Sequence, residues 1–139
     1  MRMPESRSRR WAAAVAFLAM ILPMAGCLGG ASAHAVDPPR AREALKIALD
    51  GWKAGQTPRS FRDASPPMTV QDLEWSGGGR LVDYQILDEG QARDANLRVR
   101  VKLIVDTPTQ RGTRRVEKTV WYLVGTSPSV TVFRDALHR

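Results

Sequence analysis

The chain has 139 residues, a formal net charge of +7 at pH 7 and a single cysteine. One cysteine excludes an internal disulfide, so the stability of any folded domain has to come from packing. The first 26 residues hold four arginines and one glutamate, which leaves a net charge of +4 on the remaining 113 residues. That remainder is long enough for one domain with one modest core, and its mild basicity is too small to indicate nucleic-acid binding.

The first 27 residues have the pattern of an export signal. Four arginines between positions 2 and 10 precede an apolar stretch at Trp11–Leu22, and small residues follow it. A basic segment, an apolar core of about 7–15 residues and a small-residue cleavage site are typical of secretory signal peptides. Met24-Ala25-Gly26-Cys27 then resembles the lipobox of bacterial lipoproteins, although Met24 departs from the branched residue usual there. The resemblance implies cleavage before Cys27 and a lipid on its thiol, which would anchor the chain to a membrane.

Two other interpretations of this segment stay open. Ala31-Ser32-Ala33 fits an ordinary signal-peptidase site, which would release a soluble protein. An uncleaved spanning helix is the second alternative, but it needs about 20 mainly apolar residues, and Pro23 and three glycines interrupt the stretch. We favour a layout of three parts: a signal peptide at 1–26, a lipidated cysteine with a flexible tether at 27–36, and a single α+β domain at 37–139.

The residues after the tether predict an amphipathic helix. Asp37 stands where a side chain caps a helix, and Pro38-Pro39 fits the first turn. Gly55 is placed to end this helix, and Pro58 to begin a further helical turn that carries Phe61. Apolar residues recur at spacings of three and four and make one stripe: Ala41, Ala44, Leu45, Ala48, Leu49 and Trp52.

From Met68 onwards, apolar and polar residues alternate, which is typical of β-strands half buried in a sheet. The alternation is clearest from Ala95 to Val105, and Gly, Asp and Pro mark the turns between strands. The expected strands are 68–75, 80–87, 95–105, 114–124 and 130–133, with a polar loop at 106–113.

One helix followed by four or five strands predicts an α+β fold, in which the helix packs across the apolar face of an antiparallel meander sheet. This arrangement is similar to the cystatin-like and NTF2-like folds from about Pro38 to Asp135. Gly51-Trp52-Lys53-Ala54-Gly55 and Val124-Gly125-Thr126-Ser127-Pro128 also resemble small bacterial exported proteins of a family with no assigned activity. That resemblance therefore implies nothing about chemistry.

The residue pattern predicts no catalytic residues, no metal and no cofactor. His34 and His138 have no second histidine or cysteine at ligand spacing. Gly77-Gly78-Gly79 lacks the lysine and hydroxyl residue of a phosphate loop and indicates a turn. Asp83 lies on an expected strand, where the alternation favours a carboxylate that faces solvent over a buried base.

A basic face on the sheet is the best candidate binding surface. Arg98, Arg100 and Lys102 alternate along one expected strand, about 7 Å apart, and Arg115 on the next strand is expected to join them. The alternative is an ordinary solvated face whose charges discourage strand pairing. Trp121 is adjacent to Tyr122, so the two point to opposite faces, and Trp121 is the expected exposed contact if the tyrosine is in the core.

These patterns together predict a membrane-anchored envelope lipoprotein that binds or scaffolds and does not catalyse, facing the periplasm or the cell exterior. The expected partners are the membrane, through the lipid anchor, and an envelope protein or an anionic envelope polymer, with no nucleic acid. One alternative is a small-ligand or enzymatic NTF2-like pocket with inward polar residues near Tyr84, Arg98 or Trp75. The other is a soluble periplasmic interaction module.

Overall fold

The computed structural model describes residues 35–137, so the predicted signal peptide and Cys27, and most of the tether, lie outside the described residues. The predicted helix is confirmed as α1, Pro38–Lys53. It begins where the Asp37 carboxylate accepts the backbone N–H of Arg40, while two prolines occupy its first turn. The predicted second turn of helix is confirmed as the 3-10 helix η1, Pro58–Asp63.

Six strands form one sheet in the order β1-β6-β5-β4-β2, with β3 paired to β4 beyond the end of β2. All pairs are antiparallel except β1 and β6, which are parallel with Met68 opposite Val130. The elements after η1 are β1 (Met68–Gln71), α2 (Leu73–Ser76), β2 (Arg80–Ile86), β3 (Gln91–Arg93), β4 (Asn96–Thr109), β5 (Gly112–Gly125) and β6 (Val130–Arg134).

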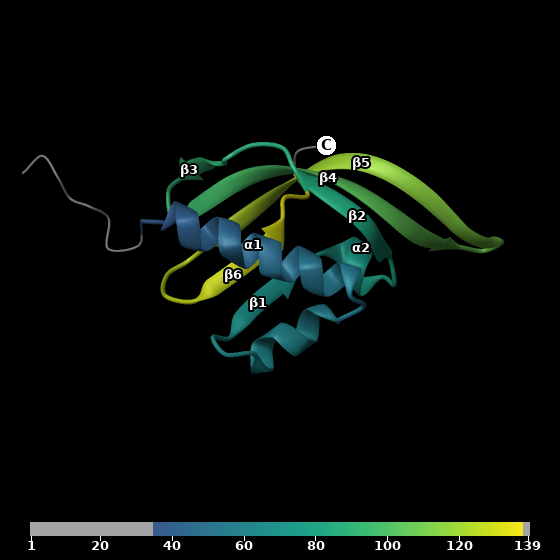
Figure 1. Ribbon diagram of the computed structural model, residues 1–139, viewed down its shortest axis with the longest axis horizontal. Helices are drawn as coiled ribbons and strands as arrows, with labels where there is room; N and C mark the ends of the chain where they lie inside the picture. The colour runs from purple at the N-terminus through teal and green to yellow at the C-terminus, as the bar shows by residue number, and fades with distance from the viewer. Residues whose placement is uncertain (1–34, 138–139) are drawn as a thin grey trace, which may run out of the picture.

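Helix α1 runs across one face of the curved sheet, here called the inner face (Figure 1). All six residues of the predicted helical stripe are buried, with exposed fractions of 6% or less. They form one core with the inner side chains of the sheet, among them Val99, Val101, Leu103 and Val105 of β4. Each fully buried side chain of this kind contributes about 1.5–3 kcal/mol, so the helix–sheet contact is the main source of stability.

The expected α+β class is confirmed, but the sheet is mixed and has one strand more than expected. The strand expected at 68–75 ends at Gln71 because the Asp72 carboxylate accepts the backbone N–H groups of Glu74 and Trp75, which starts α2. The prediction of a polar loop at 106–113 is also wrong. Strands β4 and β5 continue to a two-residue turn, with Thr109 paired to Gly112.

Candidate functional site

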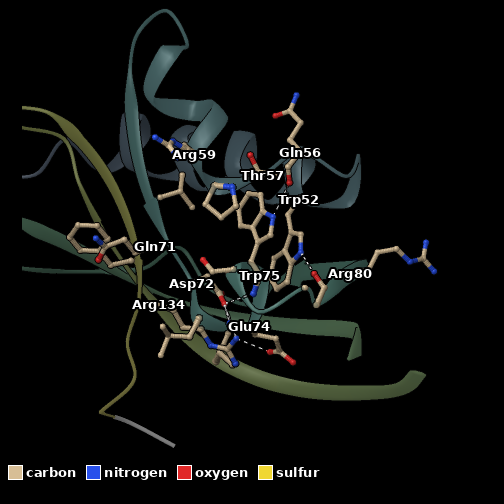
Figure 2. Close-up of a pocket in the computed structure, with 18 of the residues that line it drawn as sticks. Trp52, Gln56, Thr57, Arg59, Gln71, Asp72, Glu74, Trp75, Arg80 and Arg134 are labelled. Carbon is tan, nitrogen blue, oxygen red and sulfur yellow. Dashed lines mark hydrogen bonds and ion pairs between the residues drawn. The ribbon is translucent and has the colours of Figure 1, made fainter. Parts of the chain in front are cut away.

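An open basin of about 2010 Å³ lies on the inner side of the described domain, between η1, α2 and strands β5 and β6. Figure 2 shows Asp72, Glu74 and Arg134 close together, with the Trp52 and Trp75 rings beside them. Helix α2 is central to it, since Asp72, Glu74 and Trp75 all line the basin. The Asp72 cap positions α2, so this one residue sets where the other two side chains lie.

A pair of tryptophans forms the floor between the basin and the core. The rings of Trp52 and Trp75 are stacked with centroids 5.1 Å apart, and Phe61 meets Trp75 edge-on at 5.8 Å. The Trp52 Nε1–H donates to the Gly79 carbonyl and the Trp75 Nε1–H to the Gln56 carbonyl, each at 2.8 Å. Both rings are buried and both N–H groups are paired, which is typical of aromatic packing that fixes one element on another.

The Asp72 carboxylate is the buried centre of the basin's polar groups. The Tyr122 hydroxyl donates to its Oδ2 at 2.7 Å, and Arg134 lies 3.3 Å from its Oδ1. Burial first, and then the adjacent carboxylate, raises the pKa of Tyr122 well above its ordinary value. The phenol therefore stays neutral and serves as a hydrogen-bond donor.

Glu74 extends this group towards the sheet. Its carboxylate accepts hydrogen bonds from Lys118 and Arg134, each at 2.8 Å, and from Thr107 at 3.0 Å. Burial acts to raise the pKa of Glu74, but these three hydrogen bonds outweigh burial, so the net pKa is lowered. The basin therefore holds two carboxylates that are already paired with cations, an arrangement that fastens α2 to β5 and β6.

The predicted basic face exists as one surface, the outer face of the sheet. Each of its four cations lies beside a carboxylate, so the charges are largely compensated. Arg98 lies 3.5 Å from Asp135 and Arg100 lies 3.5 Å from Asp88. The other two ion pairs are shorter, at 2.8 Å each: Lys102 with Glu117, and Arg115 with Asp106.

Trp121 lies on this outer face, and Tyr122 is the core residue, 2% exposed. The Trp121 ring is half buried because two guanidinium groups cover it, Arg98 at 4.2 Å and Arg100 at 5.6 Å from the ring centroid. The register places Leu123 opposite Arg98 and Phe133 opposite Leu123 on the same face, and both are half buried. The outer-face cluster, as we name it, consists of Arg98, Arg100, Trp121, Leu123 and Phe133.

The three residues named for an NTF2-like pocket do not meet. Trp75 lies in the basin and Arg98 on the outer face, whereas the Tyr84 hydroxyl donates to Asp50 of α1 at 2.6 Å. Asp83 is exposed, as expected, and pairs with Lys53 at 2.8 Å. Hydrogen bonding first to Lys53 lowers the pKa of Asp83, so this carboxylate is a surface ion-pair partner.

Sequence reasoning missed the paired group in the basin. Asp72 with Leu73-Glu74-Trp75-Ser76 behind it has the form of a capped helix start, and that signal is visible in the sequence. The cations that pair with Glu74 are Lys118 on β5 and Arg134 on β6, strands that are distant from α2 in the sequence and lie beside it only in the folded domain.

Among residues 35–137 there is no group of three or more His, Cys, Asp or Glu side chains placed to hold a metal ion. No helix in that range is long and apolar enough to cross a membrane.

Comparison with protein families, with curated proteins and with solved structures finds no match for the chain.

Proposed function

We propose that this chain is an envelope lipoprotein that holds one small binding domain close to a membrane and does not catalyse. Support for the anchor is the order of features in the sequence, with a basic segment, an apolar stretch and Met24-Ala25-Gly26-Cys27 in succession. At the N-terminal end of the described domain, Val36 packs against the core and the Asp37 backbone N–H donates to the Thr126 hydroxyl at 2.9 Å. About ten residues span at most about 35 Å, so the lipid would keep the domain near the membrane surface.

The observation that carries the binding role is the outer-face cluster. Tryptophan and arginine are enriched at the centre of protein–protein interfaces, and here two arginines lie over one half-buried tryptophan. Helices α1 and η1 contribute side chains to the core on the inner side, and in Figure 1 α1 lies across that side of the sheet. The outer-face cluster therefore offers an apolar and aromatic surface from three neighbouring strands.

The same surface favours a protein partner over an anionic polymer. Each of the four predicted cations already has a carboxylate within 3.5 Å, so the face offers little uncompensated charge to a polyanion. An aromatic and arginine surface gains its affinity from desolvated packing, which is available to a folded protein partner. Tethering raises the effective concentration of this surface for any partner on the same membrane.

The anchor is tested by the intact mass of the protein isolated from its native envelope. We expect a mass that corresponds to the chain from Cys27 plus acyl chains, and we expect Cys27→Ser to abolish the acyl mass and release the protein from the membrane fraction. A mass corresponding to the unmodified chain from His34 would overturn the anchor and favour the soluble module.

The binding surface is tested by a photo-crosslinking amino acid at Thr119, which lies on the outer face opposite Lys102. We expect one discrete protein adduct in the native envelope, and we expect Trp121→Ala to remove it. The matched control carries the crosslinker at Lys46, an exposed position on α1. Equal adducts from both positions, or an adduct that persists in Trp121→Ala, would contradict this surface. Loss of envelope-polymer binding in the Arg98→Glu, Arg100→Glu double variant, without any protein adduct, would favour the polymer.

A further inference from the structure

A second hollow, separate from the basin, lies between α1 and the η1–β1 segment. One wall is the α1 face that carries Arg40, Ala44 and Ile47, and the other is η1 with the chain that follows it. Phe61, Met68 and Val130 are buried core residues that close the floor. We call this hollow the α1–η1 groove. Its volume is about 510 Å³, within the range of about 300–1,000 Å³ typical of small-molecule sites.

The groove is lined mainly by apolar atoms and is open to solvent. Ile47 on its wall is 48% exposed. It is an apolar residue at a solvent-facing position of α1, whereas its exposed neighbours Glu43 and Lys46 are charged. The exposed isoleucine and the concave apolar floor leave apolar surface in contact with water. A bound apolar ligand would cover this surface and displace the water. The groove therefore favours an apolar ligand.

The shape and charge of the groove narrow the ligand to one chemical class. The α1 wall of the groove runs over the eight residues from Arg40 to Ile47, a rise of about 10 Å, and the η1–β1 segment lines the rest of the groove. An extended peptide would bring backbone N–H and C=O groups against this apolar lining at a cost in free energy, whereas a hydrocarbon chain has no such groups. The Arg40 side chain stands at one end and forms no ion pair within the described part of the chain. Glu43 is also exposed at the rim, one turn from Arg40 on α1.

We propose that the α1–η1 groove binds the hydrocarbon chain of a free long-chain fatty acid, with the carboxylate at the Arg40 end. A carboxylate fits the unpaired guanidinium by charge, and this distinguishes a free fatty acid from the uncharged diacylglyceryl group expected on Cys27. Ile47, Phe61 and Met68 then contact the chain, and Arg40 selects the acid over its ester. The proposal stands independently of the lipid anchor, because it concerns a separate molecule bound to the described domain.

The probe is hexadecanoic acid that carries a diazirine near its methyl end, added to the full-length protein in whichever cell fraction contains it. After irradiation and digestion, we expect the label on peptides that contain Ile47, Phe61 or Met68. Excess hexadecanoic acid should compete with the probe, and methyl hexadecanoate should compete more weakly. Ile47→Asp should reduce the label about tenfold or more, because it places a carboxylate against the hydrocarbon chain.

Leu73→Asp is the matched control, since Leu73 is 85% exposed and lies outside the groove. We expect it to label as the unaltered protein does. Ile47→Trp keeps the wall apolar but fills the space, so it should also lose the label, and unchanged melting of both Ile47 variants shows that the fold is intact. In Arg40→Gln, the preference for acid over methyl ester should disappear. Equal labelling of Ile47→Asp and Leu73→Asp, or label scattered over the outer face, would overturn the proposal.

Discussion

Asp72 connects three elements through one side chain. Its carboxylate has no solvent exposure, caps α2 through two backbone N–H groups, accepts the Tyr122 hydroxyl of β5 and pairs with Arg134 of β6. Removing one partner of a buried ion pair leaves the other charge uncompensated and costs about 3–5 kcal/mol. We therefore expect Asp72→Ala to lower the free energy of unfolding by about that amount, measured by urea denaturation.

Two further variants provide a comparison for the loss of unfolding free energy in Asp72→Ala. Tyr122→Phe removes one hydrogen bond to a charged group but leaves the ion pair with Arg134, so its expected cost is about 1.5–3 kcal/mol. Asp83→Asn weakens the exposed ion pair with Lys53, and we expect it to change the free energy of unfolding in urea little. If Asp72→Ala costs no more than Asp83→Asn, the carboxylate does not hold α2 to the sheet.

Asp106, on the outer face, makes the free energy of unfolding depend on pH. A hydrogen bond from Arg115 is the largest cause that lowers the pKa of Asp106, to about 2, with burial opposing and Arg80 assisting. The unfolded pKa is about 3.9, so the folded state binds its proton more weakly than the unfolded chain does. The stabilisation is fully present above the unfolded pKa and is lost as the pH falls through about 4 to 2.

The measurement is the free energy of unfolding from urea titrations between pH 6 and 2. We expect the unaltered protein to exceed Asp106→Asn at pH 6 and this advantage to vanish towards pH 2. Asp63→Asn removes a carboxylate from an exposed position at the end of η1 and should show no such pH-dependent difference. An advantage over Asp106→Asn that is constant across this range would show that the ion pair with Arg115 and Arg80 does not form.

At the scale of elements, two glycines with the same φ angle allow the cost of a left-handed backbone to be distinguished from the cost of steric crowding. Gly55 after α1 and Gly90 before β3 both have φ +85. A Cβ at Gly55 would meet nothing within 4 Å, whereas one at Gly90 would lie 2.8 Å from Leu97 and 3.0 Å from Val99. Gly55→Ala should therefore cost about 1–2 kcal/mol for the left-handed backbone alone.

Gly90→Ala should cost about 1–3 kcal/mol more than Gly55→Ala, because the added methyl group also displaces core side chains of β4. Thermal unfolding of both variants under one set of conditions provides the comparison. Equal losses would mean that the segment before β3 moves away from Leu97 without cost. In that case β3 would contribute little to the core.

The elements that sequence reasoning predicted correctly are those whose signals are local. The α1 boundaries follow from Asp37, the two prolines and the apolar spacing, all within one helix. The parallel pairing of Met68 with Val130 joins segments far apart in the chain, so no local pattern specifies it. Alternation placed the basic residues on one face of β4 but not the carboxylates beside them, because Asp88, Glu117 and Asp135 come from other segments.

At the scale of the whole molecule, packing is concentrated where α1 crosses the sheet. The buried side chains of β4 extend to Val105, and the strand continues to Thr109 with β5 as its main neighbour. In Figure 1 the β4–β5 hairpin projects beyond the helix. Its turn end, residues 108–115, is exposed throughout. On the basin side of the hairpin, Lys118 and Thr107 both donate hydrogen bonds to Glu74.

This uneven packing predicts uneven protection from hydrogen exchange. Local opening of an exposed segment costs far less free energy than global unfolding, whose free energy is about 5–15 kcal/mol. Amides at 109–115 should therefore exchange about 100-fold faster or more than those of Val99 and Val101, although both sets belong to the β4–β5 ladder. Glu74→Gln weakens the attachment to Lys118, so it should extend fast exchange from the turn towards Lys118 while Val99 stays protected. Uniform protection along β4 and β5 would contradict this and would indicate that the hairpin opens only with the core.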